Sequence, residues 1–191
     1  DISVSSATKA IDGHGRVMGG VLAGSEELMT QVAMYCNSCG LAMSPFNAWQ
    51  LLSGVETLSL RMEKQFDNAL KIAQWLQQQP QVQAVYYTGL PDHPQAELIR
   101  KQQNGGGIVV GFEVADQETA WKIVDGVELF SRTANLGDVR STITHPWTTT
   151  HGRMQPEEKL AANIRPGLIR LSVGLEYVDD LIDDLQQALN K

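Results

Sequence analysis

The sequence predicts an α/β protein, because strand patterns and helix patterns both occur along its 191 residues. Residues 17–23 are apolar and spaced by glycines, which predicts a buried strand. Residues 57–79 carry apolar side chains at steps of three and four, which predicts a long amphipathic helix that ends at Pro80. After Pro80, short apolar strands are mixed with short helices, and this mixture favours a separate α+β unit.

Capping and breaking residues set the expected bounds in the first part of the chain. Glu26 and Glu27 suit the positive N-terminal end of a helix, which we expect to continue to about Met34. Gly40 and Pro45 are expected to break this region. The apolar stripe of the long helix consists of Leu58, Met62, Phe66, Leu70, Ala73 and Leu76.

Beyond Pro80 the pattern predicts several short strands and helices. The glycines at residues 105–107 form a flexible break before an apolar strand. Asp116 is expected to cap the next helix, because its carboxylate accepts hydrogen bonds from the free N–H groups at a helix start. Residues 128–155 are predicted to be mostly loop. The expected strands are residues 82–86, 108–114, 141–144 and 168–173, and the expected helices are residues 95–102, 117–124 and 177–189.

Composition excludes two classes of partner. The formal net charge is -7 at pH 7, whereas nucleic acids and anionic membranes bind basic patches. No apolar run approaches the length that spans a bilayer. We therefore expect neither a nucleic-acid partner nor a membrane.

Cys36 and Cys39 form a lone C-x-x-C pattern. A structural zinc site needs four ligands and this pair supplies half of them, so we predict no metal site. A redox role would need a thioredoxin-like setting, which nothing else in the sequence provides. We expect two reduced cysteines near a helix end, in a protein of the reducing cytoplasm.

The segment with the most chemistry contains Ser6, Thr8 and Lys9, followed by a glycine-rich turn. Hydroxyls donate hydrogen bonds to phosphate oxygens, and a lysine amine forms a Schiff base with an aldehyde. An extended backbone would send the Ser6 and Thr8 hydroxyls to the same side. The pattern suits a phosphate-bearing carbonyl cofactor. The alternative is a polar loop with a solvated lysine and hydroxyls that bond nearby backbone groups.

Arg170 is a second candidate, on the last predicted strand. In a strand, Ile169, Leu171 and Val173 face one way, and Arg170 and Ser172 face the other. The apolar set indicates the core side, so Arg170 is expected to point away from the core. Such an arginine either forms an exposed salt bridge or grips a carboxylate through two parallel hydrogen bonds.

Several short motifs are spread over nearly the whole chain. The first is Ser6-Ala7-Thr8-Lys9 followed by Asp12-Gly13-His14-Gly15. The further motifs are Ser44-Pro45-Phe46-Asn47-Ala48-Trp49, Gly54-Val55-Glu56-Thr57-Leu58, Arg61-Met62, Gly105-Gly106-Gly107, Asn135-Leu136-Gly137-Asp138, Thr149-Thr150-His151-Gly152 and Ile169-Arg170-Leu171-Ser172-Val173-Gly174-Leu175-Glu176. In this order they resemble the motifs of the Cys/Met-metabolism enzymes that depend on pyridoxal 5'-phosphate (PLP), the cystathionine γ-synthase-like family, and the first resembles the PLP-binding lysine segment of that family.

The resemblance implies an aspartate-aminotransferase-like PLP enzyme of fold type I. Family members are longer than this chain, and Ile2 and Val4 alternate with polar residues as in a strand. We therefore expect the chain to be the C-terminal half of a larger polypeptide. The implied parts are the end of the large PLP-binding domain at residues 1–56, a linking helix at 57–80 and a small α+β domain at 81–191.

The resemblance also implies a role for each candidate residue. Lys9 matches the lysine that holds PLP as a Schiff base and then moves protons at Cα and Cβ of the substrate. Ser6 and Thr8 are assigned to the cofactor phosphate. Arg170 matches the arginine that binds the α-carboxylate of a small amino-acid substrate. Asn135 stands where many relatives carry serine, and its amide is expected to bind that carboxylate or the lysine.

Asn135-Leu136-Gly137-Asp138 and Gly15-Arg16 resemble the sulfhydrylase branch of the family. The implied activity is that of an O-succinylhomoserine sulfhydrylase in methionine biosynthesis, a γ-replacement in which an O-acyl-homoserine and sulfide give homocysteine. Cystathionine γ-synthase, which uses cysteine as the thiol, and methionine γ-lyase, which eliminates, are alternatives. A catalytically silent folded C-terminal fragment is an alternative of another class. The resemblance further implies a parent homotetramer built from dimers.

Other polar and aromatic residues are expected to be structural. Trp49 and Trp75 lie on predicted helices and are expected in the core. His14, His145 and His151 belong to family motifs, and we expect them to anchor loops. An acidic run near the start of the last helix is expected to form a solvated face and no metal site. Its members are Asp179, Asp180, Asp183 and Asp184.

Overall fold

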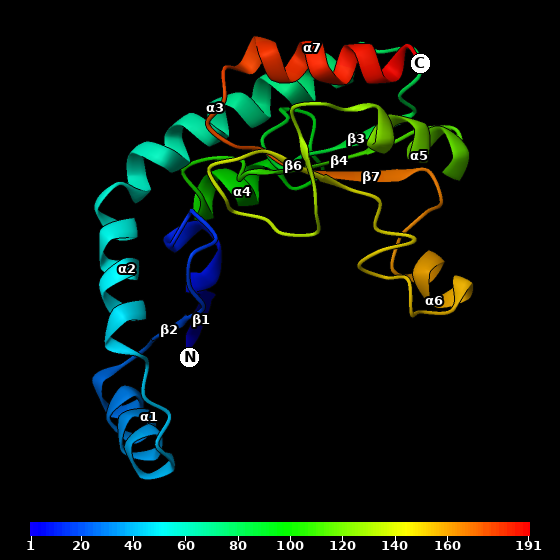
Figure 1. The fold of residues 1–191 in the computed structure, drawn as a ribbon. Helices are drawn as coiled ribbons and strands as arrows, with labels where there is room; N and C mark the ends of the chain where they lie inside the picture. Colours follow the sequence, from blue (N-terminus) through cyan, green and yellow to red (C-terminus); the bar gives the residue numbers. More distant parts are fainter. The chain divides into compact units, whose positions relative to one another are not determined.

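The computed structural model describes all 191 residues and divides them into two compact units, Asp1–Ser59 and Leu60–Lys191. Figure 1 shows the helices and strands of both units. The division falls in the first turn of the long helix that we predicted. The assignment of the chain to a large domain, a linking helix and a small domain stays a prediction.

The first unit contains a two-stranded hairpin, a short π-helical turn and two helices. Its strands are antiparallel, with Ser3 opposite Ala23 and Ser6 opposite Gly20. The turn follows the first strand directly, so the lysine segment begins where that strand ends. The elements are β1 (Ser3–Ser6), η1 (Ala7–Ile11), β2 (Gly20–Ala23), α1 (Glu26–Cys39) and α2 (Pro45–Glu56).

Local signals explain the helix bounds in this unit. Ser25 Oγ caps α1 by accepting a hydrogen bond from Leu28 N–H at 3.4 Å. The helix continues past Met34, where we expected its end, because the first residue that breaks it is Gly40. Gly40 has φ 69°, the left-handed conformation that glycine adopts just past helix ends. Pro45 starts α2, at a position where a missing N–H costs no helical hydrogen bond.

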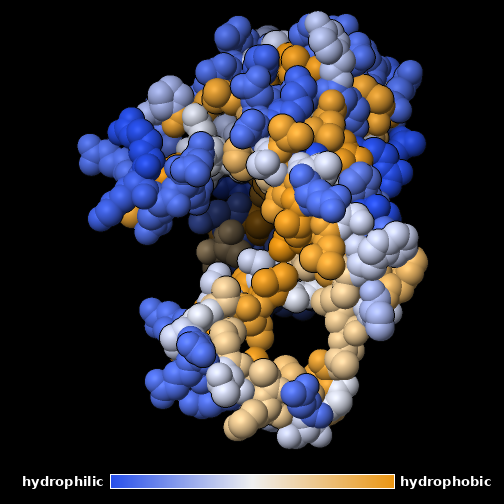
Figure 2. All heavy atoms as spheres, turned by 90° about the vertical axis from the view of Figure 1, so that its left-hand side faces the viewer, coloured by the Kyte–Doolittle hydropathy of each residue, from blue (hydrophilic) through white to orange (hydrophobic).

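Most side chains of the first unit are exposed, and two predictions of burial are wrong. The strand expected at residues 17–23 begins only at Gly20 and is exposed throughout, because only β1 pairs with it. Trp49, which we expected in the core, is 60% exposed on α2. Ala7, Val17 and Leu51 form the small buried cluster of the unit. Its exposed apolar side chains include Val4, Met18, Met34, Leu41, Phe46, Leu52 and Val55. Figure 2 shows apolar residues, coloured orange, on one face of the molecule.

The second unit contains a five-stranded sheet with the order β3-β4-β7-β6-β5. Neighbouring strands are antiparallel, except for the parallel pair β5 and β6. Helices α3, α5 and α7 cover one face of the sheet, and the main core lies between them and the strands (Figure 1). The strands are β3 (Ala84–Tyr86), β4 (Val109–Glu113), β5 (Ser131–Arg132), β6 (Thr142–Thr144) and β7 (Leu168–Ser172), and the helices are α3 (Leu58–Leu76), α4 (Ala96–Gln102), α5 (Gln117–Gly126), α6 (Pro156–Ala161) and α7 (Val178–Leu189).

Each strand and helix that we expected beyond Pro80 is present. Asp116 caps α5 as predicted, since its Oδ1 accepts a hydrogen bond from Thr119 N–H at 2.8 Å. Strand β5 and helix α6 were not predicted, because both are too short to show a period. No helix combines the length and the apolar character needed to cross a bilayer.

Helix α3 only partly follows its predicted apolar stripe. It ends at Leu76, ahead of Pro80, and its last turns pack their apolar residues into the main core. In its first half the buried residues are polar instead: Arg61, Gln65 and Asn68. This part of the helix therefore buries polar groups, and the residues of its predicted apolar stripe are only partly buried.

The prediction of a solvated acidic face on α7 is wrong at Asp184, which is only 7% exposed. Its carboxylate accepts hydrogen bonds from the N–H groups of Glu128, Leu129 and Phe130, at 2.7, 2.9 and 3.0 Å. Burial acts to raise the pKa of Asp184, but the three backbone donors together lower it. The side chain thus anchors the turn after α5 onto α7.

Candidate functional site

The lysine segment leaves β1 at Ser6 and enters the π-helical turn at Ala7. Ala7 is fully buried, so the start of the turn is fixed in the small core of its unit. Lys9 departs from helical geometry inside the turn, with φ -90° and ψ -123°. The chain therefore changes direction at the half-buried Lys9.

The predicted placement of the Ser6 and Thr8 hydroxyls on one side of an extended backbone is wrong. Ser6 ends the strand, but Thr8 lies within the turn. Thr8 Oγ1 accepts a hydrogen bond from Gly19 N–H at 3.0 Å and donates one to Gly19 O at 3.3 Å. Its hydroxyl therefore ties the turn to the residue before β2. The Ser6 hydroxyl is exposed and has no hydrogen-bond partner in the chain.

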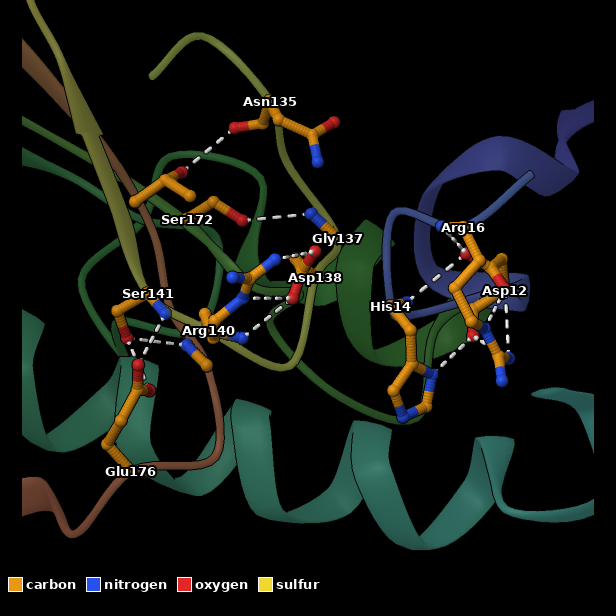
Figure 3. A network of polar contacts seen from close by, with 12 residues as sticks. Asp12, His14, Arg16, Asn135, Gly137, Asp138, Arg140, Ser141, Ser172 and Glu176 are labelled. Atoms are coloured by element: carbon orange, nitrogen blue, oxygen red, sulfur yellow. Dashed lines mark hydrogen bonds and ion pairs between the residues drawn. The ribbon is translucent and has the colours of Figure 1, made fainter. Parts of the chain in front are cut away.

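Asp12 fixes the glycine-rich turn after the lysine (Figure 3). Its buried carboxylate accepts hydrogen bonds from Arg16 N–H at 2.8 Å, Arg16 Nε–H at 3.0 Å and His14 N–H at 3.3 Å. The His14 ring also anchors this turn, as predicted, because its Nδ1 lies 2.8 Å from Asp12 O. Gly13 and Gly15 have φ 70° and 63°, which other residues adopt only at a cost. Burial acts to raise the pKa of Asp12, but the hydrogen bonds and charge of Arg16 lower it.

Helix α2 packs against the same turn, backbone to backbone. A Cβ atom on Gly54 would lie 2.3 Å from Ile11 O and 2.9 Å from Asp12 O. Because only glycine fits there, the geometry explains the glycine of the motif that begins at Gly54. A larger residue would push α2 away from the lysine turn.

The groups around Lys9 fit a phosphate-bearing aldehyde. An amine is the group that condenses with an aldehyde, and the free Ser6 hydroxyl can donate to a phosphate oxygen. Thr8 has a single hydroxyl proton, which it now donates to Gly19 O. Thr8 would have to give up that bond before it could donate to a phosphate oxygen. The Ser6 hydroxyl is therefore the more available donor of the two.

Arg170 lies in the middle of β7, and the side chains alternate as predicted. Ile169 and Leu171 are fully buried in the main core, whereas Arg170 is half-buried on the opposite face. Arg170 Nη2 donates to Ala134 O at 2.7 Å. Its Nε is buried without a hydrogen-bond partner, and burial lowers the pKa of the guanidinium. A buried donor without a partner costs free energy, which an acceptor would recover on binding.

A pocket of about 590 Å³ lies beside Arg170 on this face of the sheet. Gly111 is directly opposite Arg170 in the β4–β7 pair, so no side chain from that position fills the space. Tyr86 and Arg165 also line the pocket, and both bond the buried Glu113 carboxylate, at 2.9 and 3.5 Å. Two guanidinium groups line one pocket, and this arrangement suits an anion such as a carboxylate.

Asn135 lies in the loop before β6, next to the carbonyl group that binds Arg170. Its own carbonyl accepts a hydrogen bond from Thr142 Oγ1 at 2.8 Å. Gly137, in the same loop, donates its N–H to Ser172 Oγ at 3.0 Å (Figure 3). Strands β6 and β7 therefore hold this loop, and the fold brings Asn135 and Arg170 into one part of the second unit.

Sequence reasoning gave no role to Glu176, which links the end of the Arg170 motif to the start of β6. Its carboxylate accepts hydrogen bonds from Ser141 N–H at 2.7 Å and Ser141 Oγ–H at 2.8 Å. Ser141 Oγ in turn accepts one from Gly174 N–H at 2.8 Å (Figure 3). Asp138 lies nearby and pairs with Arg140 at 3.4 Å. These bonds fix the far end of the Asn135 loop.

Two polar residues of α3 complete this network, and both were missed because they lie beside the predicted apolar stripe, where hydrophobic periodicity leads one to expect solvent. Gln65 Nε2 donates to Val173 O at 2.8 Å and to Asp138 O at 3.0 Å. Asn68 Nδ2 donates to Gly174 O at 3.1 Å and to Glu176 O at 3.0 Å. Helix α3 therefore holds the chain after β7 through side-chain amides. Their i, i+3 spacing on one face was the signal in the sequence.

His145 anchors a loop, as predicted. It is buried, its Nε2 lies 2.7 Å from Pro166 O, and its Nδ1 lies 2.8 Å from Thr148 Oγ1. Trp121 Nε1–H donates to the same Nδ1 at 3.2 Å. Burial lowers the pKa of His145, which favours the neutral ring that these partners require. His151 anchors its loop through the backbone, because its N–H donates to Pro146 O at 3.0 Å, whereas its side chain bonds only Thr150.

No group of three or more His, Cys, Asp or Glu side chains is placed to hold a metal ion. Cys36 and Cys39 are free and lie in the last turn of α1, near a helix end as expected. Neither cysteine contacts the residues of the candidate sites through a hydrogen bond.

Comparison of the sequence with family models and with known proteins identifies one family. The family model of the Cys/Met metabolism PLP-dependent enzymes matches residues 1–190. The O-succinylhomoserine sulfhydrylase of Pseudomonas aeruginosa is 50% identical over 190 residues, which are 99% of this chain and 47% of that protein. The chain thus spans about half the length of the curated relatives it matches.

Solved structures of similar proteins superpose on the whole chain. A cystathionine gamma synthase from Xanthomonas oryzae pv. oryzae, in complex with cystathionine, gives a TM-score of 0.94 at 39% identity and covers 100% of this chain and 50% of its own. A putative O-acetylhomoserine (thiol)-lyase from Campylobacter jejuni gives 0.92 at 33% identity, covering 100% of this chain and 54% of its own. That structure contains N'-pyridoxyl-lysine-5'-monophosphate.

Proposed function

The chain belongs to the Cys/Met metabolism family of PLP-dependent enzymes, and on this premise we propose that the whole protein is an O-succinylhomoserine sulfhydrylase. The observation that carries the proposal is the 50% identity to such an enzyme over 190 residues. The predicted fold class, that of fold type I PLP enzymes, is confirmed by the superposition on solved structures of PLP enzymes over the whole chain.

Lys9 is the proposed point of attachment for the cofactor. When bound, PLP supplies an aldehyde that condenses with amines and a ring that withdraws electrons from the bonds at Cα. The kink at Lys9, fixed by the buried Ala7 on one side and by the Asp12 cluster on the other, supports this role. The Lys9 amine, once displaced by the amine of the substrate, would remove the proton at Cα and then one at Cβ.

Ser6 is the proposed main hydroxyl donor to the cofactor phosphate within this segment. Its freedom from other partners supports this role, whereas Thr8 would contribute only after exchanging its bond to Gly19 O. The two hydroxyls would supply only some of the hydrogen bonds that the phosphate accepts, since its oxygens accept several.

Arg170 is the proposed ligand of the substrate α-carboxylate, and Asn135 a second donor to the same group. The unpaired buried Nε of Arg170 and the open space beside it support this role. The bond from Arg170 Nη2 to Ala134 O holds the guanidinium plane in one orientation, which a bidentate grip requires.

The proposed reaction exchanges the leaving group at Cγ of the substrate. O-succinylhomoserine loses succinate, sulfide adds at the same carbon, and homocysteine forms. Cystathionine γ-synthase, with cysteine as the thiol, is the second candidate, favoured by the 39% identical structure with bound cystathionine. We further propose that the whole protein is cytoplasmic and assembles as a homotetramer.

An assay of the whole enzyme with each ester and each thiol tests the proposed activity. We expect the highest kcat/KM with the succinyl ester and sulfide. A higher value with cysteine would favour the second candidate. Borohydride reduction followed by peptide mapping tests the site independently, and we expect the cofactor mass on the peptide that contains Lys9. If that mass is absent and the enzyme shows no turnover, the alternative of a catalytically silent folded fragment is supported instead.

A further inference from the structure

Asn104 and Gly105 form an Asn-Gly pair in the loop between α4 and β4. Helix α4 ends at Gln102, so Asn104 lies outside regular structure, and its side chain is exposed. Neither the Asn104 side-chain amide nor the Gly105 N–H has a hydrogen-bond partner in the chain. No other asparagine in the sequence is followed by glycine.

We propose that Asn104 is a site of spontaneous deamidation. The Gly105 backbone nitrogen, after losing its proton to hydroxide, attacks Cγ of Asn104. A new N–Cγ bond forms, the Cγ–Nδ2 bond breaks, and ammonia leaves with a proton from water. Water then opens the cyclic imide at one of its two carbonyls, giving aspartate or isoaspartate. The net change is the uptake of one water and the loss of one ammonia.

The surroundings favour this reaction at Asn104 over other asparagines. Glycine lacks the Cβ atom that would hinder closure of the ring, and its backbone reaches conformations that other residues avoid. Asn37, Asn47 and Asn68 lie inside helices, where regular hydrogen bonding holds the following N–H group away from the side chain.

Packing explains why the reactive pair has a glycine at its second position. A Cβ atom on Gly105 would lie 2.2 Å from the Phe66 ring. The ring occupies the space that any larger residue would need. A residue that slows ring closure therefore cannot stand at position 105 without moving α3 or the loop.

The product would change the surface locally. Asn104 lines a pocket with Glu63, Asp67 and Arg100, so a new carboxylate would add to the two that are already present. An isoaspartate link lengthens the backbone by one carbon just before Gly106 and Gly107, whose carbonyls accept hydrogen bonds from the Thr88 and Tyr87 hydroxyls. We expect these bonds to limit the change to the pocket rim.

Peptide mapping of the whole protein after incubation at mildly alkaline pH tests the proposal. Trypsin releases residues 102–122, in which Asn104 is the one asparagine. We expect this peptide to gain the mass of an amide-to-acid exchange and to separate into two products, of which the isoaspartate form resists cleavage by a protease specific for aspartate. The rate should rise with pH, because the attacking nitrogen must lose its proton.

Two variants and a free peptide make the result decisive. Asn104→Gln should abolish the product, because its longer side chain forms a six-membered ring far more slowly. The matched variant Asn190→Gln, at an asparagine followed by lysine, should leave the product unchanged. A synthetic peptide of residues 102–122 reports the rate without the fold. If that peptide converts while the same residues in the folded protein do not, the loop protects Asn104 and the proposal is wrong.

Discussion

Arg170 combines an unpaired buried donor with one fixed hydrogen bond, to Ala134 O. Arg170→Lys keeps the charge but loses the planar fork. A hydrogen bond to a charged group contributes about 1.5–3 kcal/mol. We therefore expect kcat/KM of the whole enzyme for the homoserine ester to fall roughly tenfold or more, mainly through KM. Steady-state kinetics measures this. The matched variant Arg165→Lys, in the same pocket but paired with Glu113, should have a smaller effect, and equal effects would contradict the assignment.

Asp184 gives a prediction about stability. Asp184→Ala leaves the N–H groups of Glu128, Leu129 and Phe130 without their acceptor, so we expect a loss of roughly 2–4 kcal/mol in the free energy of unfolding. Urea denaturation measures it. Asp183→Ala, on the exposed face of the same helix, is the matched control and should change stability little. A similar loss in both variants would contradict the buried anchor.

The same carboxylate, that of Asp184, also makes the free energy of unfolding depend on pH. Folding lowers the pKa of Asp184, so its contribution to stability is present above the unfolded value of about 3.9. The contribution is lost as the pH falls through that value toward the lower folded pKa. The wild-type protein and Asp184→Ala should therefore converge in stability below about pH 4 and differ most near neutrality.

At this scale the sequence suggests candidate chemistry but not the contacts of each side chain. The grouping of Ser6, Thr8 and Lys9 suits a phosphate-bearing aldehyde but leaves a polar loop as the alternative, and the family resemblance is what favours the cofactor. The grouping did not reveal that Thr8 would bond Gly19, because that contact depends on the π-helical turn that intervenes. Asp184 was assigned to a solvated face for a similar reason. Its hydrogen-bond partners lie more than fifty positions away in the chain, and no local sequence pattern predicts such contacts.

At the scale of elements, α3 holds the chain after β7 by hydrogen bonds from two amides. Gln65→Leu keeps the size of the side chain but leaves Val173 O and Asp138 O without their donor. Each buried acceptor left unpaired costs about 1–3 kcal/mol, so we expect a clear loss of stability and a rise in KM for the ester. Denaturation and kinetics together measure this. Lys64→Leu, one position earlier on the exposed face, should alter neither quantity.

Strands were easier to predict than this helix. The alternation around Arg170 placed Ile169 and Leu171 in the core correctly, because a strand has only two faces. Helix α3 was assigned one apolar face, but its first half buries Gln65 and Asn68 instead. An interpretation from hydrophobic periodicity assigns polar residues to the solvent side of a helix. It therefore does not detect a buried helix face whose polar side chains bind backbone carbonyls.

At the scale of the molecule, motif order was enough to predict the family and the α/β fold, whereas burial in the first unit was not predicted. Apolar residues such as Val21 and Leu22 read as a buried strand, yet both are exposed. A sequence shows that a segment is apolar without showing which surface covers it. The exposed apolar side chains of this unit therefore mark surface that remains open in the described chain.

This difference between the units predicts a difference in local stability. Strands β4 and β7 are paired on both sides and carry fully buried side chains, whereas no residue of α1 is buried. Local opening requires little free energy where few apolar contacts are lost. Hydrogen-exchange mass spectrometry on the 191-residue chain should therefore show the amides of β4 and β7 exchanging slowest and those of α1 much faster. Equal protection of α1 and β7 would mean that contacts beyond those described hold the first unit in place.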